Sequence, residues 1–237
     1  MAAAPPFDIE VPPERVEPTP RWVRVRAGDR WVADSRSALL HVRYGPGVLP
    51  TYCFAPEDVD LEAVAALPPG AARRLSVADG APAELDGHWT FTWDGTVRWF
   101  EEAEEVVVHA RDPRHRVDVV PSERHVVVAH EGEVLADSRR PHALFETTLP
   151  TRWYLPPQDV RLDLLEPSTT VSRCPFKGTA RFLRHGGRDL AWVYDEPIPE
   201  CPKVAGLVCF FDEHVDLAID GERQRRPVTP WTSDPTG

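Results

Sequence analysis

Residues 21–36 of the chain read RWVRVRAGDRWVADSR, and residues 124–139 read RHVVVAHEGEVLADSR, at an offset of 103 positions. Seven of these 16 aligned positions are identical, and they include the whole Ala-Asp-Ser-Arg ending. In each stretch valines alternate with residues of the opposite face, a glycine-containing pair supplies a tight turn, and a second segment follows. The pattern predicts a β-hairpin that occurs twice in one chain.

Two shorter matches extend this repeat in the same order along the chain. Residues 49–51 (LPT) correspond to residues 149–151, and residues 56–59 (PEDV) correspond to residues 157–160 (PQDV). Two tandem copies of one domain explain all three matches. We therefore predict an extended or disordered arm at residues 1–20, domains at residues 21–120 and 121–222, and a polar tail at residues 223–237, in which Trp231 is not expected to pack on a domain.

The composition favours strands over helices. Proline occurs 26 times in 237 residues, roughly 11% against a usual value of about 5%. Four Asp-Gly pairs provide further tight turns, since both residues tolerate a positive φ. Helices are expected only at Pro56–Leu67 and, shorter, at Pro157–Leu165. The predicted fold is all-β and mainly antiparallel, with at most one or two short helices.

The charge of the chain argues against several classes of partner. The formal net charge is −11, so nucleic acid and anionic membrane surfaces are poor partners. No apolar run approaches the roughly 18 residues that span a bilayer. The start of the chain lacks the features of a secretory signal. The four separated cysteines are typical of reduced thiols. We expect a cytoplasmic protein that is a monomer, with its two copies forming a pseudo-dimer, or a weak homo-oligomer.

The motifs of several common sites are missing from the sequence. There is no CxxC pair, GxGxxG, GxxxxGK[ST] or GxSxG, so dinucleotide, mononucleotide and hydrolase functions have no local support. No histidine and cysteine spacing fits structural zinc. We therefore expect neither a metal nor another cofactor.

The strongest candidate for chemistry is Cys174-Pro175-Phe176-Lys177-Gly178, which the first copy lacks. Lysine occurs only at positions 177 and 203, whereas arginine supplies the other 25 cations. Gly178 permits a turn after Lys177, which would hold the ammonium group in a fixed place. We predict a polar and aromatic pocket for an unidentified small molecule, with ligand-binding residues Lys177, Glu146, Arg152, Tyr154, Cys174, Trp192 and Tyr194.

In this pocket Lys177 would contact an anionic or carbonyl group, oriented by Glu146 and Arg152, while the aromatic rings would provide apolar contact. Two other functions stay open. An enzyme could use Lys177, Glu146 and Cys174 on a small metabolite, and a module without a pocket could bind a protein partner through exposed hairpin edges. The remaining alternative is that these residues have a purely structural role. Cys174 would then be a small buried hydrophobic residue, and Trp192 and Tyr194 would belong to the core.

The second copy resembles a known family of domains. The resemblance rests on the run from Ala136-Asp137-Ser138 through Leu149–Pro156, on Cys174–Ala180 (CPFKGTA) and on Ala191–Tyr194 (AWVY). These motifs are similar to those of the domain of unknown function 427 (DUF427), which is also described as nucleotidyltransferase-like. The resemblance extends over about residues 15–222 and implies tandem copies of a small β-tent-like domain without zinc cysteines.

The chain departs from that family pattern at two positions. Phe176 and Trp153 stand where tyrosine is usual, so any hydroxyl used there has been lost. The first copy keeps the Ala-Asp-Ser-Arg and Leu-Pro-Thr motifs but has no counterpart of CPFKG. The resemblance implies no reaction. Because both lysines lie in the second copy, any site is expected to be single.

Overall fold

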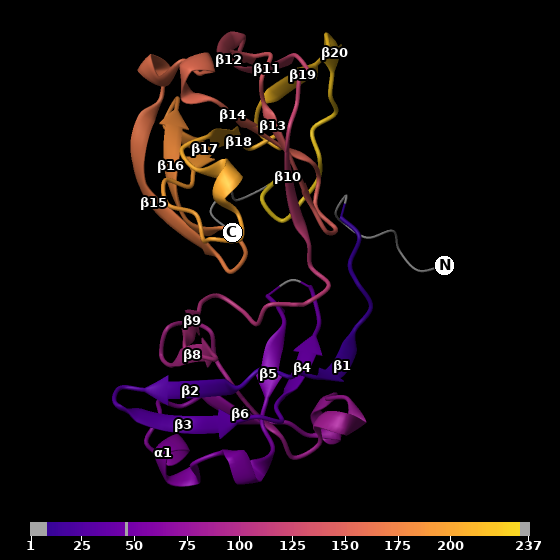
Figure 1. Cartoon of the computed structure of the whole chain (residues 1–237), viewed down its shortest axis with the longest axis vertical. Helices are drawn as coiled ribbons and strands as arrows, with labels where there is room; N and C mark the ends of the chain where they lie inside the picture. The colour runs from indigo at the N-terminus through magenta and orange to yellow at the C-terminus, as the bar shows by residue number, and fades with distance from the viewer. Residues whose placement is uncertain (1–8, 46, 233–237) are drawn as a thin grey trace. The chain divides into compact units, whose positions relative to one another are not determined.

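The structure, a computed structural model, describes residues 9–45 and 47–232. These residues divide into two compact units, residues 11–112 and residues 113–232 together with residues 9 and 10. We call them the first and second domains (Figure 1). All pairings between the named strands of the described residues are antiparallel, as the sequence predicts.

The first domain consists of three small sheets with the strand orders β1-β4-β5, β3-β2-β8-β9 and β6-β7. Its core is rich in aromatic rings, and Trp93 stacks on Trp99 at 4.3 Å between ring centroids. The elements are β1 (Arg15–Pro18), β2 (Val23–Ala27), β3 (Arg30–Ser35), β4 (Leu39–Val42), β5 (Thr51–Cys53), α1 (Leu61–Ala65), β6 (Ala72–Arg74), β7 (Trp89–Phe91), β8 (Arg98–Glu101) and β9 (Glu104–Val106).

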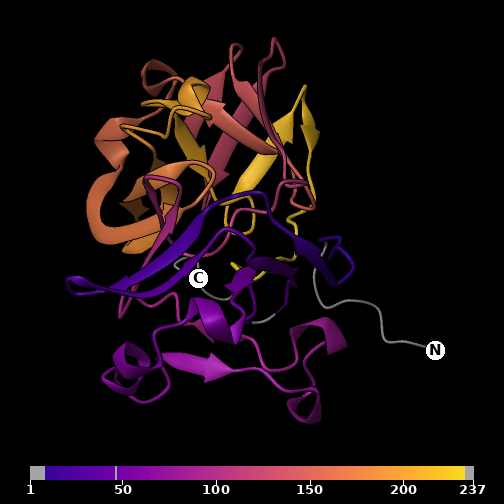
Figure 2. The same ribbon diagram turned by 60° about the horizontal axis from the view of Figure 1, so that its bottom comes forward.

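The second domain contains a seven-stranded sheet, β10-β13-β14-β18-β17-β16-β15, and a four-stranded sheet, β12-β11-β19-β20. Figures 1 and 2 both show the orange hairpin of β15 and β16 curving around one side of this domain. The strands are β10 (Val117–Pro121), β11 (Val126–His130), β12 (Glu133–Ser138), β13 (His142–Glu146), β14 (Arg152–Leu155), β15 (Glu166–Cys174), β16 (Gly178–His185), β17 (Arg188–Val193), β18 (Val208–Phe210), β19 (Asp216–Ile219) and β20 (Glu222–Arg223).

The seven-stranded sheet separates two apolar cores, because successive side chains of a strand point to opposite faces. One face carries Trp153 and packs with Val126 and Leu217 of the four-stranded sheet. The other face carries Tyr154 and Trp192, which pack with Phe211. We call these the Trp153 face and the Trp192 face.

The predicted helix at Pro56–Leu67 is wrong as a continuous element. A 3₁₀ turn at Pro56–Asp58 is followed by an extended Val59 and then by α1. Val59 forms an isolated bridge with Ala33, and this long-range pairing interrupts the helix. The segment Pro157–Leu165 breaks in the same way, since Val160 bridges Ala136 between the 3₁₀ turns Pro157–Asp159 and Leu162–Leu164. The remaining 3₁₀ turns are Val77–Asp79, Ala83–Leu85 and Pro202–Val204.

The structure revises the boundaries expected at residues 20, 120 and 223. Residues 15–18 of the predicted arm form β1, paired with β4, while residues 1–8 lie outside the described part. β10 was assigned to the first copy, but it pairs with β13 and therefore belongs to the second domain. In the tail Thr229 is only 1% exposed, and Trp231 packs against the core of the Trp192 face, contrary to expectation.

Among the described residues, no helix has the length and apolar character that crossing a bilayer requires.

Candidate functional site

The turn that carries Lys177 connects β15 to β16 in the second domain. Gly178 begins β16 with a φ of +104°. This backbone conformation is strained for any residue that has a Cβ atom, so it favours glycine. A Cβ at this position would lie 3.3 Å from the backbone nitrogen of Ile198. That nitrogen donates a hydrogen bond of 3.1 Å to the carbonyl oxygen of Lys177. The turn is thus held against the segment around Ile198, and Lys177 has a fixed backbone position.

Lys177 lies in a buried charged cluster on the Trp192 face. Its Nζ donates to Oε2 of Glu146 at 2.5 Å, and Nε2 of His115 lies 3.0 Å from the other oxygen of Glu146. The side chains of Glu146 and Lys177 are 6% and 10% exposed. The ring of His115 stacks on Phe176 with centroids 4.2 Å apart. Glu146 therefore joins β13, the lysine turn and the segment before β10.

The two central charges of this cluster reinforce each other. Burial alone raises the pKa of Glu146, but Lys177 and His115 outweigh it and bring that pKa down to about 2. Burial alone lowers the pKa of Lys177, and the charge of Glu146 outweighs it, so that pKa is raised. Both groups are therefore ionised at neutral pH.

Two more of the predicted residues border the lysine. Tyr194 is 4% exposed, and burial raises the pKa of its hydroxyl although Lys177 opposes the shift. Within the described residues this hydroxyl makes no hydrogen bond. Burial also raises the pKa of Cys174, in spite of the charge of Lys177. The thiol is thus protonated at neutral pH, which does not suit a nucleophile.

Tyr154 and Trp192 are parts of the core. The indole nitrogen of Trp192 donates to the hydroxyl of Tyr154 at 3.0 Å, and their rings meet edge to face at 6.3 Å. Trp192 also packs on Phe211 at 4.5 Å. Both rings are therefore buried in the core of the Trp192 face and do not line a pocket that is open to solvent.

Arg152 does not join the lysine cluster, in contrast to its predicted role beside Lys177. Its guanidinium donates two hydrogen bonds to Glu213, at 2.9 and 2.6 Å, and lies 3.4 Å from Asp212. The hydroxyl of Thr229 donates to Glu213 at 2.6 Å. Because Glu213 occupies both of its terminal nitrogens, Arg152 is committed within the protein.

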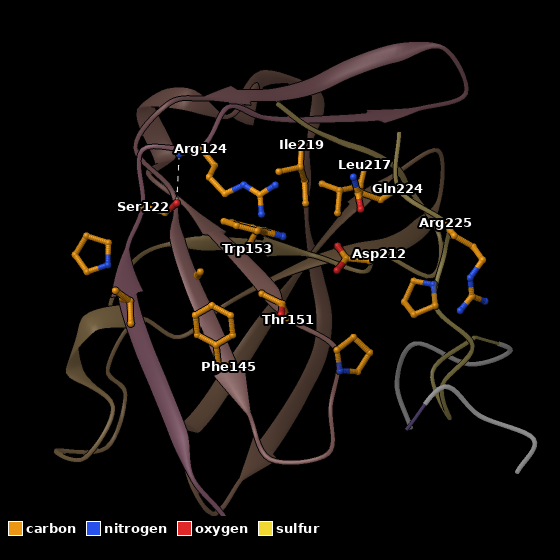
Figure 3. Close-up of a pocket in the computed structure, with 15 residues that line it drawn as sticks. Ser122, Arg124, Phe145, Thr151, Trp153, Asp212, Leu217, Ile219, Gln224 and Arg225 are labelled. Carbon is orange, nitrogen blue, oxygen red and sulfur yellow. Dashed lines mark hydrogen bonds between the residues drawn. The ribbon is translucent and has the colours of Figure 1, made fainter. Parts of the chain in front are cut away.

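The cavity that the structure defines lies elsewhere, on the Trp153 face. Its volume is about 430 Å³, and none of the seven predicted residues lines it. Figure 3 shows the ring of Trp153 and the carboxyl group of Asp212 at its centre. Its lining consists of Val120, Pro121, Ser122, Arg124, Ala143, Phe145, Pro150, Thr151, Trp153, Asp212, Leu217, Ile219, Gln224, Arg225 and Pro227.

Sequence reasoning missed His115, Asp212 and Glu213. The charged residues with which they form ion pairs lie 31 to 61 positions away in the chain. Among the described residues no group of three or more histidine, cysteine, aspartate or glutamate side chains could hold a metal ion.

Comparison with known proteins agrees with the family resemblance. Residues 118–221 match the sequence profile of a family described as a domain of unknown function, DUF427. The matched region includes β11 to β19, Glu146 and the lysine turn, but not the first domain. The chain matches none of the curated proteins with which it was compared. The comparison therefore supports the family resemblance for residues 118–221, within the second domain.

Proposed function

We propose that the second domain binds a small molecule through an anionic or carbonyl oxygen, which Lys177 and Tyr194 contact. The observation that carries this proposal is a buried ammonium with spare donors beside the hydroxyl of Tyr194, for which the described residues supply no hydrogen bond. A lysine has three N–H donors, and within residues 9–45 and 47–232 only Glu146 accepts from Lys177. A ligand oxygen would accept from both Lys177 and Tyr194.

The energetics of the cluster favour a functional role. Two buried charges lose their hydration, and apolar residues of similar volume are often as stabilising as such a pair. A network of Lys177, Glu146 and His115 is therefore not needed to hold a sheet together. Strongly shifted pKa values at a site with unused donors are typical of functional positions.

The same observations favour recognition of charge over amine chemistry. An imine-forming lysine needs a lowered pKa, so that the neutral amine is populated. Glu146 has the opposite effect on Lys177. The proposed role of Lys177 is that of a fixed positive charge, oriented by Glu146 and His115.

We also propose that the two domains are copies of one unit, of which only the second carries the site. The hairpins β2–β3 and β11–β12 share the same burial pattern in their first strands. Their registers shift at equivalent places, at Val25/Arg26 and at Val128/Ala129, 103 positions apart. The lysine turn belongs to the hairpin of β15 and β16, for which the described part of the first domain has no matching pair of strands.

A thermal-shift titration of the intact protein tests the binding proposal. The probes are pyruvate, succinate and inorganic phosphate, each raised to about 10 mM, because fragments of this size bind weakly. We expect at least one probe to raise the melting temperature, since it binds only the native state. Tyr194→Phe should weaken its affinity about tenfold, the worth of one hydrogen bond, and Lys177→Met should abolish the shift.

The matched control is Lys203→Met, which removes the only other lysine. Lys203 is exposed and donates to the carbonyl oxygen of Val119, so its loss should leave the titration unchanged. Lys177→Arg should retain binding if charge recognition is the role. The proposal fails if no probe raises the melting temperature, or if Lys177→Met and Tyr194→Phe both respond like the unaltered protein.

A further inference from the structure

The cavity on the Trp153 face contains a buried carboxyl group in largely apolar surroundings. Asp212 is 7% exposed, and the cavity around it is lined mainly by apolar side chains such as Trp153, Phe145, Leu217 and Ile219. Trp153 and Asp212 both line the cavity, as Figure 3 shows. A cavity of about 430 Å³, lined by nine apolar and six polar or charged residues, is of the size that holds small ligands.

The charges around this carboxyl group are not balanced. One guanidinium, that of Arg152, serves two buried carboxylates. Glu213 takes both hydrogen bonds from it, and Asp212 lies at 3.4 Å. No other ion pair of Asp212 occurs in the described residues. Burial raises the pKa of Asp212 to about 6, although Arg152 opposes the shift. At neutral pH the group is ionised, and one negative charge faces the cavity without a full partner.

The arginines at the edge of the cavity do not supply the missing charge. Arg124 forms an ion pair with Asp220, with Nε 2.7 Å from its carboxylate, and its guanidinium lies 5.6 Å from the ring of Trp153. Arg225 also lines the cavity and is not free, and no ion pair joins it to Asp212 in the described residues. Because Arg152 is shared with Glu213, a positive charge brought by a ligand would complete the electrostatic complement of Asp212.

The remaining walls indicate what this ligand carries besides its charge. Trp153 and Phe145 offer aromatic surface, and an ammonium group near an aromatic ring is attracted to the ring face. Leu217 and Ile219 add apolar surface on another side. A hydrated metal ion would leave the aromatic and aliphatic walls without a contact, whereas an amine with an apolar body can contact both Asp212 and these walls.

We propose that this cavity binds a small organic amine, whose ammonium group pairs with Asp212 and whose aromatic or other apolar body packs on Trp153 and Phe145. The site is separate from the lysine cluster, since none of Lys177, Glu146 and His115 lines the cavity. It does not depend on the function proposed above.

A comparison of three probes of one shape tests the charge preference without any substitution. Benzylamine, benzyl alcohol and benzoate are titrated into the intact protein near neutral pH and followed by ligand-observed NMR, up to about 20 mM. We expect benzylamine to bind at least tenfold more tightly than benzyl alcohol, and benzoate to bind most weakly. Equal or tighter binding of the alcohol or of benzoate would overturn the proposal, as would the absence of benzylamine binding over this range.

Variants then locate the binding. Asp212→Asn keeps the shape of the side chain and should weaken benzylamine binding at least tenfold while leaving benzyl alcohol unaffected. Ala143→Leu extends a side chain that lines the cavity and should weaken both probes. The matched control is Asp163→Asn. It removes an exposed carboxylate of the same domain, which pairs with Arg161, and it should leave the affinity for both probes unchanged. Unaltered benzylamine affinity in Asp212→Asn would place the amine elsewhere and refute the assignment.

Discussion

The ion pair between Lys177 and Glu146 offers the sharpest test of the site geometry. Lys177→Met keeps the length of the side chain but leaves the carboxylate of Glu146 buried with only His115 as a partner. Glu146→Gln leaves the ammonium of Lys177 buried without its counter-charge. Either change removes one half of a buried pair, which is more damaging than removing both halves.

The structure supplies the magnitude of this effect. The pKa of Glu146 falls from its ordinary 4.5 to about 2 in the folded protein. At about 1.4 kcal/mol per tenfold change in proton affinity, this shift corresponds to about 3 kcal/mol of stability at neutral pH. We expect each single variant to cost about 3–5 kcal/mol, and the double variant Lys177→Met/Glu146→Leu to cost less than the sum.

The sign of the pH dependence follows from the direction of the shift. A carboxyl group whose pKa is lowered by folding stabilises the protein fully above its unfolded pKa, here 4.5. This contribution disappears as the pH falls from about 5 toward 2, because the unfolded chain takes up the proton first. In Lys177→Met the acid-dependent loss of stability should be much smaller.

Urea unfolding of the intact chain, read by hydrogen exchange in peptides from residues 113–232, isolates the second domain from the first. Lys203→Met controls for the loss of a lysine at the surface. Costs below about 1 kcal/mol for both single variants would mean that the pair is solvated. Strict additivity in the double variant would mean that the two groups do not interact. Either result would refute the buried site.

Three further outcomes follow from the second domain. Arg152→Met should lower the free energy of unfolding by about 3–5 kcal/mol, because it leaves two buried carboxylates without their counter-charge. Asp212→Asn should instead leave the melting temperature unchanged or raise it at neutral pH. Calorimetry distinguishes the two, and equal losses of stability would contradict the excess of negative charge at Asp212. Cys174 should react with iodoacetamide at neutral pH at least about tenfold more slowly than free cysteine, since burial raises its pKa; peptide mass spectrometry measures the rate, and rapid labelling would reopen the nucleophile hypothesis. Gly178→Ala should destabilise the domain by about 1–3 kcal/mol, because alanine strains at positive φ and its Cβ would press on the backbone of Ile198; an unchanged melting temperature would show that the turn is not held.

Much of the architecture was predictable because it depends on neighbours in the chain. Alternating valines and glycine turns specify the hairpin of β11 and β12, where Glu131 and Gly132 have the positive φ values of a tight turn. The helix at Pro56–Leu67 was not predictable in its broken form. Its interruption depends on the bridge between Val59 and Ala33, which no local pattern encodes.

The candidate site, too, was predictable from the sequence only in part. Composition and motif single out Lys177, the predicted pocket includes Glu146 beside it, and the two are in contact in the folded chain. The cavity, by contrast, depends on which side chains of β13 and β14 face the four-stranded sheet. A shift of one residue in register would exchange the buried and exposed sets.

By itself, the sequence determined the strands, the turns, the repeated hairpin and the singular lysine, since each of these depends on residue types a few positions apart. Only the tertiary structure decided which charges are buried together. The pairing of Arg152 with Glu213 and Asp212, and of Glu146 with His115, joins residues 31 to 61 positions apart. The energy of such pairs depends on distance and loss of water, and folding alone brings about both.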